Sequence, residues 1–155
     1  MKLSEALKLQ KTIMAELKNT QNIMIANNSH RVDTDIDMLA LSEQQLLNRE
    51  AMIALKLAIR EATPAHIVEN IFKLSELKED LKCFSRMSTK EGIFIEDEIP
   101  VMYEVYNDKS SIDSKIKELK IEIASIEKML EDFNSTTDIQ ISNVLFANKI
   151  FNPKN

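Results

Sequence analysis

Side chains that could bind an anion lie in two of the predicted connections between helices. Arginine occurs only at positions 31, 49, 60 and 86, so the guanidinium groups able to grip a phosphate or carboxylate are scarce. In an antiparallel bundle both connections lie at one end, where a tyrosine ring can stack on a base, and the pattern predicts a pocket for an anionic, nucleotide-like molecule. The candidate lining residues are His30, Arg31, Arg86, Lys90, Tyr103 and Tyr106. The alternative is that these are solvated loop residues whose surface ion pairs contribute little energy.

An alternating run of aspartates imitates the start of a calcium-binding loop. Asp33, Asp35 and Asp37 have the spacing of the first EF-hand ligands. That loop needs glycine at its sixth position and a bidentate glutamate at its twelfth, where this chain has Met38 and Gln44. The aspartates therefore indicate the start of a helix, where a short acidic side chain caps free backbone N–H groups.

The remaining chemically active side chains form no complete catalytic or metal-ligand set. His30 and His66 are separated by a predicted helix and have no ligand partner three or four residues away, so the usual zinc spacing is missing. Cys83 lies beside an apolar stripe and is predicted to be a buried structural residue. The acidic run 96–98 could bind a divalent ion together with Glu91, although such runs usually face water and discourage strand pairing. No metal ligand and no cofactor is predicted.

The composition argues against several large classes of protein. One glycine and three prolines in 155 residues leave little material for Rossmann folds, barrels, sandwiches or glycine-rich phosphate loops. A net charge of −5 without a Lys/Arg run argues against a nucleic-acid partner. No stretch approaches the roughly 20 apolar residues needed to cross a bilayer. The interrupted apolar pattern of the first 17 residues and the single cysteine predict a cytoplasmic protein.

Apolar periodicity predicts four long amphipathic helices, at about 3–24, 33–62, 63–84 and 109–133. The first stripe is expected to contain Leu3, Leu7, Met14, Leu17 and Met24, with Gln10 and Gln21 in its polar gaps. The second is expected to place inward Ile36, Leu39, Leu46, Leu47, Ile53 and Leu57. The fourth, with the most regular spacing, contains Ile112, Ile116, Leu119, Ile123, Ile126, Leu130 and Phe133. The fold class is mainly α, a bundle or coiled coil of long antiparallel helices.

A small β element and a C-terminal arm complete the predicted architecture. Strands are expected near 93–95 and 138–142, in a helical domain 1–137 with an extended insert 87–107, followed by an arm 138–155. Either the insert runs extended along the bundle or the strands meet between subunits, and both favour a homo-oligomer. The residues expected to join the copies are Ile139, Ile141, Leu145, Phe146, Ile150 and Phe151.

Four segments resemble landmarks of the septicolysin-like family of bacterial and phage helical proteins. They are the opening MKLSEAL, the stretch 37–40, the series Arg86, Ser88, Glu91 and Ile93, and the ending Phe133, Asn134, Thr136, Thr137, Asp138 and Ile139. The resemblance spans nearly the whole chain and implies a helical, oligomeric fold. The family name suggests a cytolysin, but the resemblance supplies no catalytic residues, and this sequence shows no secretion signal or membrane-inserting segment.

These patterns predict a non-enzymatic, self-associating helical protein that acts by binding. One alternative is an oligomer, from a mobile element such as a phage, that sequesters an anionic, nucleotide-like ligand. A second alternative is a hydrolase that uses the acidic run 96–98 with a divalent metal ion. An enzyme needs an acid, base or nucleophile on a rigid scaffold, and the sequence presents no such set.

Overall fold

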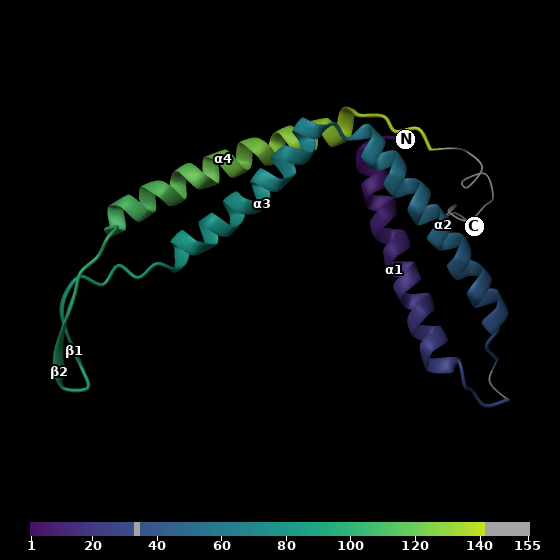
Figure 1. The fold of residues 1–155 in the computed structure, drawn as a ribbon, viewed down its shortest axis with the longest axis horizontal. Coiled ribbons are helices and arrows are strands. Elements are labelled where there is room, and N and C mark those ends of the chain that lie inside the picture. Colours follow the sequence, from purple (N-terminus) through teal and green to yellow (C-terminus); the bar gives the residue numbers. More distant parts are fainter. Residues whose placement is uncertain (33–34, 142–155) are drawn as a thin grey trace. The chain divides into compact units, whose positions relative to one another are not determined.

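The computed structural model describes residues 1–32 and 35–141. They form, in chain order, α1 (Leu3–Asn27), α2 (Met38–Ala62), α3 (Ala65–Arg86), β1 (Gly92–Glu96), β2 (Ile99–Tyr103) and α4 (Lys109–Thr136) (Figure 1). The predicted class, mainly α with a small β element, is confirmed. Contacts divide the described residues into two units, one of Met1–Pro64 together with residues 132–141, the other of Ala65–Glu131. No described helix is apolar over enough of its length to cross a membrane.

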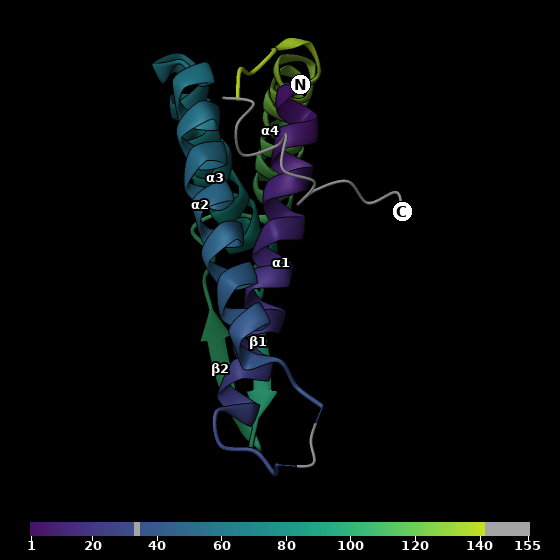
Figure 2. The ribbon, with the colours of Figure 1, turned by 90° about the vertical axis from the view of Figure 1, so that its right-hand side faces the viewer.

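Helices α1 and α2 lie side by side and antiparallel, and the core of the first unit lies between them (Figures 1 and 2). Asp37 begins α2 by accepting the backbone N–H of Ala40 at 2.9 Å. This confirms the capping interpretation for that aspartate, whereas residues 33–34 lie outside the described part. The buried members of the core are Leu3, Ala6, Ile13, Ala51, Met52, Leu55, Ala58 and Ile139.

The buried row of α1 differs from the predicted stripe by a rotation of the helix. Its buried residues are Leu3, Ala6, Ile13 and Thr20. Met14, which was expected inside, is 60% exposed. Ala6 belongs to the core between α1 and α2, where a small side chain lets two helix backbones approach closely.

α2 is a helix, as predicted, but the side that faces the core is not the predicted one. Its buried residues are Asn48, Ala51, Met52, Leu55 and Ala58. Five of the six residues expected in the core are instead exposed: Leu39, Leu46, Leu47, Ile53 and Leu57. The helix has two apolar faces, and the one with small residues packs on α1, where Ala6 is equally small.

Residues just after α4 pair with the first residues of the chain. The backbone N–H of Leu3 donates to the Thr137 carbonyl at 2.8 Å, and that of Ile139 to the Met1 carbonyl at 2.9 Å. Between them Lys2 and Asp138 form a single antiparallel bridge. The predicted strand 138–142 is therefore one bridge at Asp138, with Ile139 buried in the α1–α2 core and residue 142 outside the described part.

The Lys2–Asp138 pair gives this closure a dependence on pH. Lys2 Nζ lies 2.8 Å from Asp138 Oδ2, and this hydrogen bond lowers the pKa of Asp138. A depressed pKa contributes stability above the unfolded-state value of about 3.9, and the contribution is lost as pH falls through the folded value. Asp138→Asn should therefore lower Tm at pH 7 but lose less than the wild type on acidification below about pH 4. Glu16→Gln, on the exposed side of α1, is the control; equal acid sensitivity of Asp138→Asn and wild type would contradict the assignment.

In the second unit, α3 and α4 lie side by side and run antiparallel (Figure 1). Two ion pairs link them, Lys73 to Glu122 at 2.6 Å and Lys78 to Glu127 at 2.7 Å. The predicted stripe of α4 is confirmed, because its buried residues are four members of that stripe: Ile112, Leu119, Ile123 and Ile126. Asp108 caps the helix by accepting the Ser111 N–H at 2.7 Å, and this bond lowers the pKa of Asp108.

The segment between α3 and α4 folds back on itself as a hairpin. β1 and β2 are antiparallel, with Gly92 paired to Tyr103 and Glu96 paired to Ile99. Both turn residues have positive φ, 49° at Asp97 and 68° at Glu98. This corrects the expectation that the insert runs extended along the bundle, whereas pairing of strands between subunits stays a prediction. Two-residue hairpin turns usually contain glycine or asparagine, so an Asp-Glu turn gave no recognisable signal.

Candidate functional site

The outer side of α2 carries a row of exposed large apolar side chains, one about every two turns of the helix, with polar or charged residues in the turns between the first three. Leu39, Leu46, Ile53 and Leu57 are 71%, 45%, 53% and 55% exposed, and we call them the outer stripe. At 3.6 residues per turn they fall within about 40° of one another. They lie opposite Asn48 and Leu55, which face α1. Large exposed apolar patches bordered by polar residues mark interaction sites, and the outer stripe is the candidate for such a patch.

Charged residues of opposite sign border the two sides of the outer stripe. The helical repeat places the acidic edge about 40–60° to one side of the stripe's centre and the basic edge about 40–80° to the other. The acidic edge consists of Glu43, Glu50 and Glu61, and the basic edge consists of Arg49, Lys56 and Arg60. All six side chains are exposed. The surface therefore combines an apolar centre with one negative and one positive border.

The hairpin has two chemically different faces. On its aromatic face, Phe94 and Tyr103 meet edge to face with ring centroids 5.7 Å apart. Lys90 Nζ lies 5.1 Å from the Tyr103 centroid and 3.2 Å from Glu96 Oε1. The Tyr103 hydroxyl donates to the same Glu96 oxygen at 2.6 Å. This hydrogen bond is the main cause that lowers the pKa of Glu96 and raises the pKa of Tyr103.

The opposite face of the hairpin carries exposed apolar side chains. Ile93, Ile95 and Met102 point to this side of the pleat and are 70%, 78% and 71% exposed. The polar groups of the aromatic face bind one another, while the apolar groups of the other face contact water. The acidic run 96–98 forms the end of β1 and the turn, and its Glu96 is engaged with Lys90 and Tyr103.

The six predicted anion-binding residues fall into both units. His30 and Arg31 follow α1 in the first unit, where His30 Nδ1 lies 2.9 Å from the Asn27 carbonyl oxygen. Arg86, Lys90, Tyr103 and Tyr106 belong to the second unit. Among these four the structure brings together Lys90 and Tyr103, and the charge of this lysine is already balanced by Glu96. Arg86 ends α3, and the Tyr106 side chain is fully exposed.

Two of the predicted assembly residues lie at the core of the first unit, and the cysteine lies on the surface. Ile139 is buried between α1 and α2 of its own chain, and Ile141 packs against the same core. The other four, Leu145, Phe146, Ile150 and Phe151, lie outside the described residues. Cys83 is exposed, so the expectation that it is a buried residue was wrong. The helical repeat places Cys83 on the opposite side of α3 from the half-buried Leu77 and Leu81, so an apolar neighbour in the sequence does not show which way a helical side chain points.

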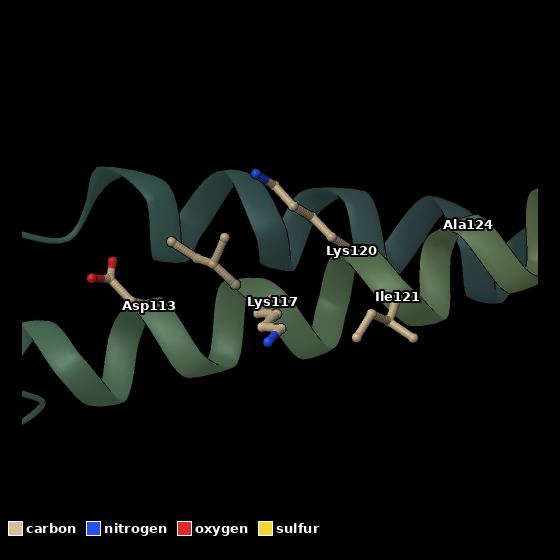
Figure 3. Close-up of a pocket in the computed structure, with 6 residues that line it drawn as sticks. Asp113, Lys117, Lys120, Ile121 and Ala124 are labelled. Atoms are coloured by element: carbon tan, nitrogen blue, oxygen red, sulfur yellow. The ribbon is translucent and has the colours of Figure 1, made fainter.

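The hollows on α4 are shallow and lie along one side of a single helix. One, of about 420 Å³, is lined by Asp113, Ile116, Lys117, Lys120, Ile121 and Ala124 (Figure 3). A second, of about 530 Å³, shares Asp113 and Lys117 with it. Figure 3 shows that Lys117 and Lys120 do not point toward one another, so they form no clamp for an anion. Within residues 1–32 and 35–141, no three His, Cys, Asp or Glu side chains gather into a group that could hold a metal ion.

The residues of the outer stripe of α2 were predicted to lie in the core, so they were not recognised from the sequence as an exposed surface. The signal that could have identified it is the charge pattern, since a glutamate row and an arginine–lysine row border the leucines on α2. Asn48 was also missed. Its side chain is 1% exposed and accepts a hydrogen bond from Gln44 Nε2 at 2.9 Å. A buried asparagine on an apolar helix face leaves no periodic signal, because polar residues are assumed to face water.

Comparison with models of protein families, with curated proteins and with solved structures finds no match to this chain. The resemblance to the septicolysin-like family therefore stays a prediction. The segments that carry it at the two ends, 1–7 and 133–139, contact each other through the Leu3–Thr137 and Lys2–Asp138 bonds. Whatever their ancestry, these segments have a structural role here: they close the first unit.

Proposed function

We propose that this chain is a non-enzymatic, self-associating helical protein that acts by binding in the cytoplasm. The outer stripe of α2 is the observation that carries the proposal. Four large aliphatic side chains lie exposed in one row, opposite the face that packs on α1. Burial of apolar surface drives association, at roughly 25 cal/mol per Å² removed from water. One acidic and one basic border make this face complementary to a parallel copy of itself, so the proposed occupant is a second copy of the chain.

The cytoplasmic part of the proposal is supported by the chemistry of Cys83. The thiol is exposed and is the single cysteine of the chain, so no intramolecular disulfide can form. A reducing compartment keeps such a thiol from joining chains at random. The family resemblance, which implies a helical oligomer, supports the same proposal.

Light scattering tests self-association directly. The wild-type protein should have a mass above 17.8 kDa, the mass of one chain, over a dilution series. Ile53→Lys should lower the mass toward one chain, because a charge in the stripe is costly to bury. Ile121→Lys is the matched control: it replaces an isoleucine that is 63% exposed on α4 with the same residue and should leave the mass unchanged. A wild-type mass of one chain at every concentration would refute the proposed function.

A further inference from the structure

The two charged edges of α2 restrict how two copies can face each other. Each edge has one sign, with Glu43, Glu50 and Glu61 on one side and Arg49, Lys56 and Arg60 on the other. The outer stripe lies between them, so any helix that covers the stripe brings its own flanks against these charges. Charges across an interface fix its orientation more strongly than its affinity.

A two-fold axis can relate two copies of α2 in two ways. If the axis runs along the helices, they are parallel, and the left flank of each meets the right flank of the other. If the axis is perpendicular to the helices, they are antiparallel, and each flank meets the same flank of the second copy. Parallel pairing thus places the acidic edge against the basic edge, whereas antiparallel pairing places like charges together.

From this charge pattern we infer that the outer stripe of α2 binds the outer stripe of a second copy, with the two helices parallel and in register. The inference rests on the proposed self-association and specifies its surface and orientation. In this arrangement every stripe residue lies opposite its own copy, as parallel helical dimers require. Glu50 then lies level with Arg49 of the second copy, and Glu61 level with Arg60, because each pair is adjacent in the sequence.

The antiparallel alternative is disfavoured by specific residues. Aligning the stripes in opposite directions places Leu39 opposite Leu57 of the second copy, and Leu46 near position 50. Glu43 then lies within a turn of Glu50 of the second copy, on the same side of the interface. Like charges placed together oppose association. The two arrangements therefore predict different pairs of neighbouring positions, which cysteine cross-linking distinguishes.

The experiment uses the full chain with Cys83→Ser, because the native thiol is exposed and would cross-link by itself. Leu39→Cys and Leu57→Cys are introduced separately, at positions 71% and 55% exposed where the change leaves the core intact. After mild oxidation at low protein concentration, each single variant should run mostly as a covalent dimer on a non-reducing gel. Ile121→Cys, on exposed α4, is the control and should stay mostly monomeric.

Three results would overturn the parallel pairing. Single variants that fail to cross-link, while the Leu39→Cys, Leu57→Cys double variant does, would show antiparallel helices. Equal cross-linking of Ile121→Cys would show that random collisions explain the bands. Absence of cross-linking at both stripe positions, in a protein whose mass in reductant exceeds one chain, would place the interface elsewhere and leave the proposed function standing. A mass of one chain in reductant would refute both the proposed self-association and the parallel pairing.

Discussion

Replacing Leu55 with alanine should lower the free energy of unfolding by about 2–5 kcal/mol, the cost of a buried cavity of this size. Leu55 is 0% exposed and lies in the middle of the core between α1 and α2. Helices of this length are held mainly by packing of their apolar faces rather than by intrinsic propensity. Two long helices cannot close around the missing side chain without losing their contact at Ala51 and Ala58, so most of the cavity should remain.

Urea denaturation followed by circular dichroism measures this loss. Tyrosine fluorescence reports separately on unfolding of the second unit, because Tyr103 and Tyr106, the two tyrosines of the chain, lie there. Leu47→Ala is the matched control; the same atoms are removed from a side chain 37% exposed on the same helix, and the loss should be less than about half as large. Equal losses for Leu55→Ala and Leu47→Ala would show that the core lies elsewhere on α2.

Asn48→Asp should destabilise the protein at pH 7 by about 3–5 kcal/mol, the cost of an uncompensated buried charge. Asn48 is 1% exposed, and its side-chain oxygen accepts a hydrogen bond from the neutral amide of Gln44. A carboxyl buried there without a cation has a pKa raised above its unfolded value of about 3.9. The penalty is complete above the folded pKa and vanishes below the unfolded one, so the variant should approach wild-type stability as pH falls toward 3.9.

Asn48→Leu is the control for the charge. It removes the buried amide, and Gln44, which is exposed, can turn its own amide to water. We expect a change of about 1 kcal/mol or less, because a donor left in water costs little. Thermal denaturation between pH 3.5 and 7 separates the variants. If Asn48→Asp matched the wild type at pH 7, water would have to reach position 48.

The sequence was informative where one face of a helix carries one kind of residue. α4 was predicted closely because isoleucine and leucine occupy its stripe without a polar interruption. α2 was predicted as a helix but turned the wrong way, because two of its faces are apolar and periodicity alone cannot rank them. Packing ranks them: Ala51 and Ala58 allow close approach to α1, and the larger leucines remain outside.

The predicted anion-binding residues and the pairing of the two ends were harder to predict, because they depend on which segments of the chain the fold brings together. The hairpin brings together Lys90 and Tyr103, two of the six predicted ligand residues, but also Glu96, which had been assigned to a separate acidic run. Its turn was hidden because Asp97 and Glu98 adopt positive φ without glycine. Pairing of residues 1–3 with 137–139 could not be read from local patterns at all, since one backbone bridge leaves no periodicity.

That last pairing has a consequence for the order of events during biosynthesis. The first unit is discontinuous: it needs Ile139 to complete the core that α1 and α2 begin, whereas Ala65–Glu131 lies entirely between its two parts. Domains fold as units while the ribosome proceeds from the N-terminus. All residues of the second unit are therefore synthesised before the first unit is complete. A released chain that ends at Glu131 should fold its second unit, while the core between α1 and α2 still lacks Ile139.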